Sequence, residues 1–292
     1  AQMITSFYRT SFVIALLFFT CIPGNSAKAK YASLIIDAQT GLELHSRNAN
    51  TKKFPASLTK IMTLYMIFDA LENKKWSLRK RLKVSRRASR QPQTRLGLKR
   101  GSTITVKTAI LALITRSAND VATVVAENMS GSEIKFAGQM TRKARKLGMV
   151  RTTFRNASGL PNRRQFSTAR DMAKLAIAIR TDFPQYYHFF KTKKFRYRGR
   201  TYRNHNMLLG RYSGTDGVKT GYTNASGYNL VASVKRRGKH LIGIVFGGKT
   251  GPRRDRHMVN LFDRSFRKMD KLAKVLPPVP VSYTHLTLPT KA

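Results

Sequence analysis

The sequence has almost no cysteine. Cys21 is the only one among 292 residues, so a disulfide within the chain is excluded and the fold must be held by a packed core. At 41% hydrophobic content the chain is long enough for one large domain with at most a small appendage. The six histidines are scattered, and none forms a ligand pair at helical spacing. We therefore expect no metal site and no cofactor.

Acidic residues are also scarce. The chain has 13 Asp and Glu against 56 Lys and Arg, a formal net charge of +43. Such a surface attracts polyanions. Residues 74–100 contain twelve Lys or Arg, no acidic residue and few large apolar side chains. That composition predicts an exposed, irregular lobe.

No apolar run is long enough for an ordinary transmembrane helix, which needs ~20 residues. The longest run, over residues 11–20, follows Arg9 and precedes Pro23, with a small-x-small sequence at residues 27–29. This pattern is typical of a secretory signal peptide cleaved before Lys30, with an uncleaved anchor as the alternative. The sequence therefore predicts an exported protein, and its basicity belongs to the exported part.

The remaining pattern predicts a mixed fold. Residues 32–37 and 42–46 form an expected hairpin, as do residues 228–234 and 240–246. Amphipathic or apolar periodicity predicts helices over residues 106–115, 121–127, 169–179 and 255–273, and a further helix that starts near Ser57. The last residues, 281–292, match neither a helical pattern nor the composition of the preceding chain. They resemble the translation of a DNA sequencing adapter, as found in assembled environmental sequence data.

Three short strings carry the chemistry: Ser57-Leu58-Thr59-Lys60, Ser117-Ala118-Asn119 and Lys219-Thr220-Gly221. Residues three apart share a helix face, so Lys60 can reach the hydroxyl of Ser57. A lysine acts as a base only when neutral, and its ordinary pKa is ~10.4. Burial or a neighbouring cation must lower that pKa, and Lys219 is the candidate neighbour.

Each string alone is weak. Ser-x-x-Lys also describes a capped helix with an exposed lysine, and Ser or Asn before a helix is ordinary N-cap chemistry. Their order and separation raise the specificity, as do the flanking sequences. These extend over residues 36–41, 55–63, 156–161 and 216–223.

With these motifs, residues 31–269 resemble the D-alanyl-D-alanine carboxypeptidases of the low-molecular-mass penicillin-binding protein type, serine peptidase family S11. The three-part signature is a known one for the superfamily that includes class A β-lactamases. The resemblance implies an α/β (α+β) fold, β-lactamase/transpeptidase-like, with an antiparallel sheet flanked by helices and an all-helical lobe. It implies a signal peptide at 1–29, a catalytic domain at 30–274, and a linker start with a non-native tail at 275–292.

The resemblance also implies roles for the catalytic residues. Ser57 would attack the carbonyl between the last two D-alanines, and Lys60 would take the serine proton. Ser117 would pass a proton toward the leaving amine.

Five further residues would bind substrate by the same resemblance. Asn119 would hold the substrate amide, and Thr220, with Lys219, would bind the terminal carboxylate. Gly221 and Tyr222 continue that strand, and the backbone N–H groups of Ser57 and Tyr222 would form the oxyanion hole.

One position departs from the family. Some relatives carry a carboxylate-binding arginine on the segment before Lys-Thr-Gly, where this chain has His205. Carboxylate binding would then depend more on Thr220 and Lys219.

Three alternatives remain open. A class A β-lactamase needs a glutamate that activates water, and Glu127 and Glu133 do not stand in a suitable loop. A D,D-endopeptidase acting on peptidoglycan cross-bridges would use the same site. Residues 191–203 interleave basic and aromatic side chains, as in a binder of nucleic acid or another anionic polymer, but also as in an amphipathic strand pair.

The expected partners follow from these readings. They are peptidoglycan stem peptides, β-lactam antibiotics as covalent inhibitors, and an anionic membrane or cell wall as a peripheral surface. No nucleic acid is expected, because the export signal argues against it. The expected location is the periplasm or cell envelope of a bacterium.

Overall fold

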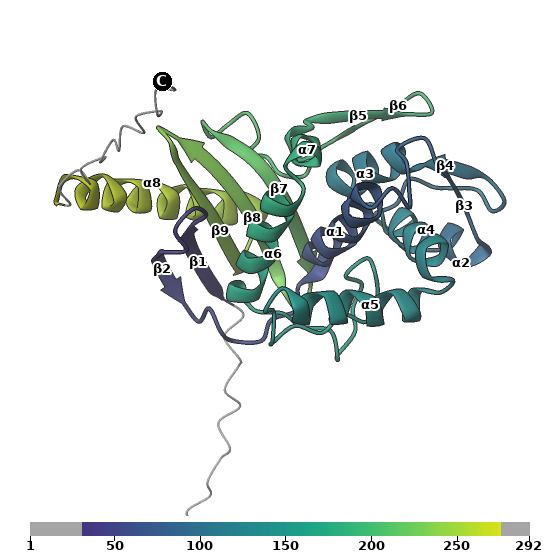
Figure 1. Cartoon of the computed structure of the whole chain (residues 1–292), viewed down its shortest axis with the longest axis horizontal. Helices are drawn as coiled ribbons and strands as arrows, with labels where there is room; N and C mark the ends of the chain where they lie inside the picture. Colours follow the sequence, from purple (N-terminus) through teal and green to yellow (C-terminus); the bar gives the residue numbers. More distant parts are fainter. Residues whose placement is uncertain (1–30, 276–292) are drawn as a thin grey trace, which may run out of the picture.

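The computed structural model describes residues 31–275. The predicted signal peptide, its cleavage site and the C-terminal tail lie outside the described residues. Five antiparallel strands form the central sheet, in the order β2-β1-β9-β8-β7 (Figure 1). Their bounds are β1 Ala32–Asp37, β2 Glu43–Arg47, β7 Thr215–Thr223, β8 Gly227–Arg236 and β9 Lys239–Gly248.

Helices cover both faces of this sheet. Successive side chains of a strand point to opposite faces, so Leu34 joins one apolar cluster and Ile35 the other. On the Ile35 face the cluster includes Met258 and Phe262 of α8 (Gly251–Val275). On the Leu34 face it includes α6 (Ala169–Asp182) and extends into the helical lobe. Both predicted hairpins of the sheet are confirmed.

The lobe beside the sheet is mainly helical. Its central helix is α1, which is buried on almost every side and is preceded by a 3-10 turn at Ala56–Leu58. Ser57 therefore lies just before the helix rather than in its first turn. Helix α1 spans Thr59–Glu72. The other elements of the lobe are β3 (Arg81–Lys83), α2 (Arg86–Ser89), β4 (Thr103–Thr105), α3 (Val106–Thr115), α4 (Asn119–Ser130) and α5 (Glu133–Lys146).

The prediction of an irregular lobe over residues 74–100 is wrong in part. The basic side chains of this segment are mostly exposed, as expected. However, β3 pairs with β4, and α2 packs on the lobe through Ala88. Buried Leu82, Val84 and Leu98 fix the segment to the apolar cluster. These few buried apolar side chains are enough to hold the segment on the lobe, because its long charged side chains can extend into solvent.

Between the lobe and β7 the chain forms α7 (Pro184–Tyr187), a 3-10 turn (His188–Lys191) and a projecting hairpin, β5 (Lys194–Tyr197) and β6 (Arg200–Arg203). This hairpin is the amphipathic strand pair that the alternation of residues 191–203 allowed. Within residues 31–275 we find no helix with the length and apolarity that a membrane span requires.

Candidate active site

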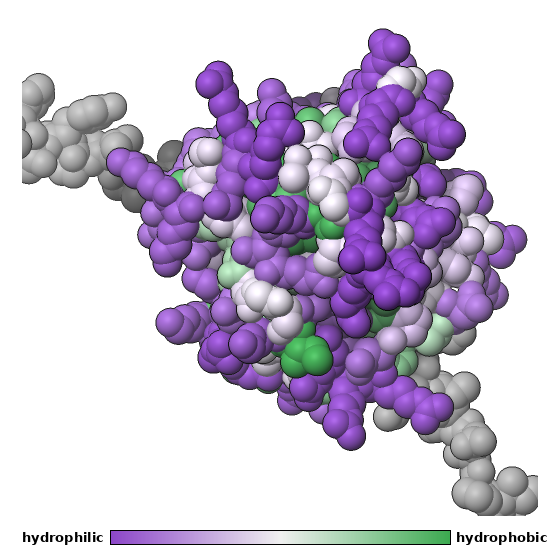
Figure 2. All heavy atoms as spheres, turned by 90° about the vertical axis from the view of Figure 1, so that its right-hand side faces the viewer, coloured by the Kyte–Doolittle hydropathy of each residue, from purple (hydrophilic) through white to green (hydrophobic). Residues whose placement is uncertain are grey.

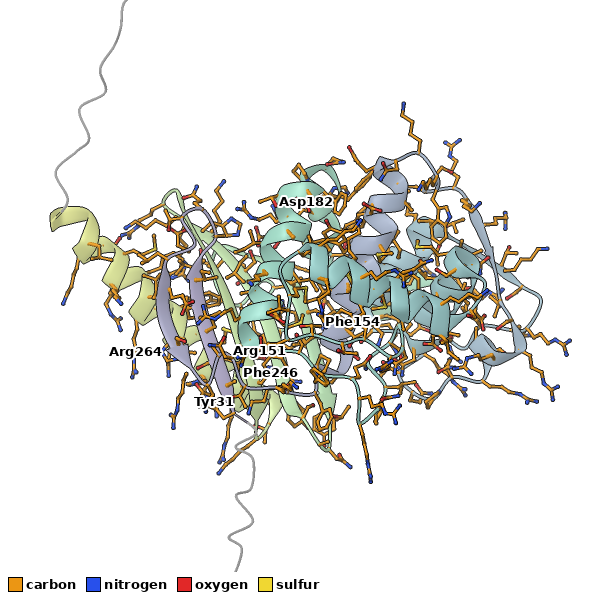
Figure 3. All side chains as sticks on the ribbon, turned by 60° about the horizontal axis from the view of Figure 1, so that its bottom comes forward. Tyr31, Arg151, Phe154, Asp182, Phe246 and Arg264 are labelled. Atoms are coloured by element: carbon orange, nitrogen blue, oxygen red, sulfur yellow. The ribbon has the colours of Figure 1, made fainter. Side chains whose placement is uncertain are left out.

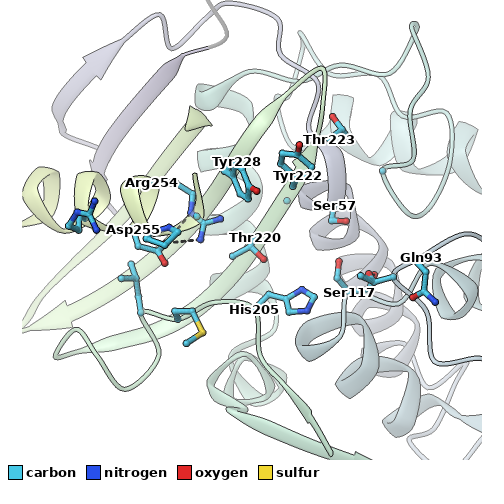
Figure 4. Close-up of a pocket in the computed structure, with 18 of the residues that line it drawn as sticks. Ser57, Gln93, Ser117, His205, Thr220, Tyr222, Thr223, Tyr228, Arg254 and Asp255 are labelled. Carbon is cyan, nitrogen blue, oxygen red and sulfur yellow. Dashed lines mark hydrogen bonds and ion pairs between the residues drawn. The ribbon is translucent and has the colours of Figure 1, made fainter. Parts of the chain in front are cut away.

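The three motifs meet where the sheet adjoins the helical lobe. A cleft of about 830 Å³ lies between β7, the Ala56–Leu58 turn and the connection from α3 to α4 (Figure 4). Six of the predicted residues and His205 line it: Ser57, Ser117, Asn119, His205, Thr220, Gly221 and Tyr222. The other two, Lys60 and Lys219, are buried and do not line the cleft.

Lys60 is held in one position by polar partners. Its Nζ donates to Oδ1 of Asn119 at 2.8 Å and to the carbonyl oxygen of Ser158 at 2.6 Å, and it lies 3.1 Å from Oγ of Ser57. A neutral amine has two N–H groups and one lone pair. The two oxygen acceptors use both N–H groups, so the lone pair of a neutral Lys60 faces the serine hydroxyl.

The environment of Lys60 favours this neutral form. Complete burial lowers its pKa well below the ordinary value, and the nearby charge of Lys219 lowers it further. The negative charges of Asp120 and Glu133 raise the pKa of Lys60. Burial, followed by repulsion from Arg254, also lowers the pKa of Lys219, to about 7. The structure thus agrees with the expectation that Lys219 lowers the pKa of Lys60, although burial is the larger cause of the shift.

The turn between α3 and α4 presents Ser117 to the cleft. Ser117 adopts a left-handed backbone conformation with φ of 59°, which a non-glycine residue seldom adopts. Thr94 stabilises the turn, because its Oγ1 donates to the Ser117 carbonyl at 2.9 Å and its own carbonyl accepts from the Asn119 N–H at 2.7 Å. The buried Oγ of Ser117 has no hydrogen-bond partner among the described residues.

Residues 92–94 also orient the Asn119 side chain. Its Nδ2 donates to the carbonyl oxygens of Pro92 at 3.0 Å and Gln93 at 3.1 Å, so Oδ1 points at Lys60. The carboxylate of Asp120 holds the same loop through the N–H groups of Leu96, Gly97 and Leu98. Sequence reasoning assigned no role to this loop, since only its basic residues were conspicuous.

Two glycines allow the main chain to pack closely around Ser57. A Cβ at Gly221 of β7 would lie 3.0 Å from the backbone nitrogen of Ser57. Gly159 has φ of 86°, and a Cβ there would overlap the carbonyl oxygen of Ala56 at 1.8 Å. Only glycine fits these positions without displacing the serine turn. The loop over residues 156–161 was noticed in the sequence only as a flanking string.

The end of the cleft near Thr220 is electropositive. Figure 4 places the Thr220 side chain between Arg254 and the His205 ring. Arg254, from the first turns of α8, is 5% exposed and donates to the carbonyl of Asn229 at 3.1 Å and to Asp255. No sequence signal singled out Arg254, which stands in a run of basic residues.

His205 faces the same end of the cleft. Burial, together with repulsion from Lys219, Arg116, Lys60 and Arg254, lowers the pKa of its imidazole to about 4. The ring is therefore neutral at physiological pH and can donate one hydrogen bond without adding a charge.

Side chains that could hold a metal do not gather in the described part of the chain. Between residues 31 and 275 no group of three or more His, Cys, Asp or Glu lies close enough together. The polar groups in and beside the cleft are those of acyl transfer: a hydroxyl, an amine whose pKa burial lowers, a second hydroxyl and a cationic end.

Comparisons with known proteins agree with this geometry. The profile of the D-alanyl-D-alanine carboxypeptidase family (peptidase family S11) matches residues 22–250. D-alanyl-D-alanine carboxypeptidase DacC of Escherichia coli is 37% identical over 84% of this chain and 63% of its own length. The chain spans a little under two thirds of the length of DacC and of the related carboxypeptidases DacF of Bacillus subtilis and DacA of Escherichia coli.

Solved structures show the same fold. Penicillin-binding protein 5 from Haemophilus influenzae superposes with a TM-score of 0.78 at 30% identity, over 81% of this chain and 70% of that one. A Listeria monocytogenes penicillin-binding protein in its ampicillin-bound form gives a TM-score of 0.70 at 30% identity, over 80% and 96%. The predicted fold class, an antiparallel sheet flanked by helices, is thereby confirmed, although the lobe is not all-helical as expected, because β3 and β4 pair within it. The chain belongs to the D-alanyl-D-alanine carboxypeptidase family of serine peptidases.

Proposed function

We propose that this protein is a serine-type D-Ala-D-Ala carboxypeptidase that removes the terminal D-alanine from peptidoglycan stem pentapeptides. The observation that carries the proposal is the buried Lys60 amine, bonded to Asn119 and Ser158 and 3.1 Å from Oγ of Ser57. A neutral amine in that position can accept the serine proton at physiological pH.

The reaction proceeds in two steps. Ser57 Oγ forms a bond to the carbonyl carbon between the two D-alanines while Lys60 takes the hydroxyl proton. The C–N bond then breaks, Ser117 relays the proton that Lys60 took to the departing amine, and D-alanine leaves with Lys60 neutral again. Water hydrolyses the resulting ester, which frees Ser57 and releases the shortened peptide as a carboxylic acid.

The other predicted residues bind and polarise the substrate. The Ser57 and Tyr222 N–H groups stabilise the oxyanion, where one donor typically contributes ~10²–10³ in rate. Asn119 holds the acyl-side amide, and Gly221 lets β7 approach. Thr220, with Lys219 nearby, holds the terminal carboxylate.

Arg254 and His205 join Thr220 in the carboxylate site. The Arg254 guanidinium is fixed by Asp255 before any ligand arrives, so little side-chain ordering is needed on binding. His205 contributes a neutral N–H.

The first experiment is a time course with a fluorescent penicillin, alongside D-alanine release from diacetyl-Lys-D-Ala-D-Ala. We expect a stable label and D-alanine release, both lost in a folded Ser57→Ala variant. Retained label in that variant would refute Ser57 as the nucleophile. Rapid loss of label with hydrolysed penicillin would indicate a β-lactamase, and cleavage of cross-linked muropeptides faster than pentapeptides would favour the endopeptidase alternative.

The ampicillin-bound relative supports β-lactams as covalent inhibitors of this chain. We further propose export to the bacterial cell envelope, with residues 1–29 as signal peptide, 30–274 as catalytic domain and 275–292 as a linker start with a non-native tail. The family's cell-wall substrate supports this location.

The basic surface supports a peripheral association with an anionic cell wall or membrane. Figure 2 shows a hydrophilic face over the helical lobe, and Figure 3 shows nitrogen-tipped side chains projecting around the molecule. On the hairpin β5–β6, Lys194 and Arg203 are exposed directly opposite each other, while Phe195 and Tyr202 stack on the other face. Sacculus binding that does not weaken between low and physiological salt would contradict this association.

A further inference from the structure

A second cavity, of about 330 Å³, lies beside the nucleophile. It shares Gly159, Leu160, Pro161 and Thr223 with the main cleft, and Ala56 contributes to its wall immediately before Ser57. The two hollows therefore border the same four residues next to the reacting serine. Neither Thr220 nor Arg254 lines the second cavity.

The position of this cavity fits the acyl side of the substrate, an assignment that rests on the proposed function. With the terminal carboxylate at Thr220 and Arg254, and the reacting carbonyl at the N–H groups of Ser57 and Tyr222, the leaving group occupies one end of the cleft. The rest of the peptide must continue past Tyr222 toward Thr223, which Figure 4 places at the other end. An extended peptide advances about 3.3 Å per residue, so the residue before D-Ala-D-Ala lies near Thr223.

The walls of the cavity are mainly apolar, with a few uncharged polar residues (Asn162, Gln165 and Thr223) and a single charged side chain. The apolar members are Phe54, Pro55, Ala56, Leu160, Pro161 and Ala225. Arg163 also lines the cavity, and no acidic residue does. The exposed Arg163 side chain makes no hydrogen bond or ion pair with another residue of the described part of the chain, so its guanidinium is free to bind a ligand.

The loop that forms this wall is held rigid by its own hydrogen bonds. Asn156 Nδ2 donates to the Leu160 carbonyl at 3.0 Å, and the Arg164 N–H donates to Oδ1 of Asn162 at 2.9 Å. The buried Gln165 side chain accepts from the Arg155 N–H at 2.8 Å. Gln165 is uncharged and its side chain is held within the loop. Arg163 is therefore the lining residue that can distinguish ligands by their charge.

We propose that this cavity binds the side chain of the residue before D-Ala-D-Ala, and that it selects a long aliphatic side chain ending in a carboxylate over one ending in an ammonium. The apolar walls accept the methylene stem. The guanidinium pairs with a carboxylate through two parallel hydrogen bonds and repels an ammonium.

The test uses peptides N-acetyl-X-D-Ala-D-Ala in which X is L-2-aminopimelate, L-lysine or L-norleucine. The first two carry four methylenes and differ in the terminal group, a carboxylate in one and an ammonium in the other. We expect kcat/KM for D-alanine release to be about tenfold higher with aminopimelate than with lysine, which equals about 1.4 kcal/mol. Norleucine should lie between them.

Arg163→Gln should bring the ratio close to one, and Arg163→Glu should reverse it. Arg164→Gln is the matched control, because it removes the same charge from the neighbouring exposed position, which does not line the cavity. The norleucine rate and penicillin acylation should stay unchanged in all three variants. Equal rates with aminopimelate and lysine in the wild type, or an equal effect of both glutamine variants, would overturn the inference.

A binding measurement separates this inference from the proposed function. Calorimetry of the same peptides with Ser57→Ala reports their affinities without turnover. A tenfold preference for aminopimelate there supports the subsite even if no peptide is cleaved, and equal affinities overturn it even if D-alanine is released.

Discussion

Lysine occupies opposite environments in the buried layer beside the cleft and on the surface of the helical lobe. Lys60 and Lys219 are 0% and 1% exposed, and burial lowers the pKa of each. Lys74 and Lys75 of the lobe are exposed and belong to a segment of twelve basic residues. Burial, rather than local abundance of positive charge, is thus the largest cause of the lowered pKa values of Lys60 and Lys219.

The causes of the pKa shifts support this distinction. After burial, the charge that lowers the pKa of Lys60 comes from Lys219, and for Lys219 it comes from Arg254. No lobe cation is among the causes for either group. Surface charge and catalytic chemistry should therefore be separable by mutation.

Replacing Lys60 should have the largest effect. Lys60→Gln keeps a hydrogen-bonding side chain but cannot accept a proton, so the rate of acylation by a fluorescent penicillin should fall about 10²–10⁴-fold. Lys75→Gln, which removes an exposed lysine, should leave that rate unchanged. A loss smaller than tenfold in folded Lys60→Gln would mean that the base lies elsewhere.

Replacing Lys219 should reduce activity and alter the pH profile. Lys219→Met removes a cation that favours the carboxylate, so kcat/KM for D-alanine release should fall about ten- to a hundredfold. Loss of this charge also raises the pKa of Lys60. The acid limb of the acylation profile should therefore move to higher pH, and an unmoved limb would show that the two amines are not coupled.

The same substitution tests stability. The pKa of Lys219 is about 7 in the folded protein and ordinary when unfolded, so the unfolded state binds more protons between these values. The cost in folding free energy of burying a charged Lys219 is full below pH 7. It disappears as the pH rises toward the pKa of a free lysine. Lys219→Met should have a higher Tm than the wild type at pH 6, and the difference should shrink toward pH 10.

A fixed charge in place of His205 should have a smaller effect. The wild-type imidazole is neutral well above its pKa of about 4. His205→Arg supplies a charged donor to the substrate carboxylate, and about 1 kcal/mol of additional binding would lower KM roughly fivefold. His205→Gln, a neutral donor, should leave KM within about twofold. Equal KM values for both variants would place the carboxylate away from this side chain.

Neutralising the surface should have the smallest effect on chemistry. The double variant of Arg196→Gln and Arg203→Gln on the hairpin should leave kcat/KM for a small peptide unchanged and weaken binding to isolated sacculi. The matched pair, Arg267→Gln and Lys268→Gln on α8, removes the same charge from exposed positions elsewhere. Equal losses for both pairs would indicate that binding follows net charge rather than the hairpin surface.

Much of this arrangement could be predicted from the sequence. Local patterns gave both hairpins of the sheet and the helices α1, α3, α4, α6 and α8, whereas the convergence of the three motifs was implied by the family resemblance. Helix α5 was missed, because its buried face rests on Phe136 and Met140 among many basic residues. The roles of residues 92–94 and Arg254 depend on contacts across the fold, with Asn119 and Asn229, which no local pattern encodes.

The contact of Gly159 with Ala56 also bears on how such sequences are interpreted. A chain can retain all three motifs and still lose its nucleophile's position if a side chain appears at Gly159, because that side chain would occupy the space of the Ala56 carbonyl. Motif matching would classify such a chain as an enzyme, but we expect that a fluorescent penicillin would not label it. Active and inactive members of the family can thus differ at a residue that performs no chemistry.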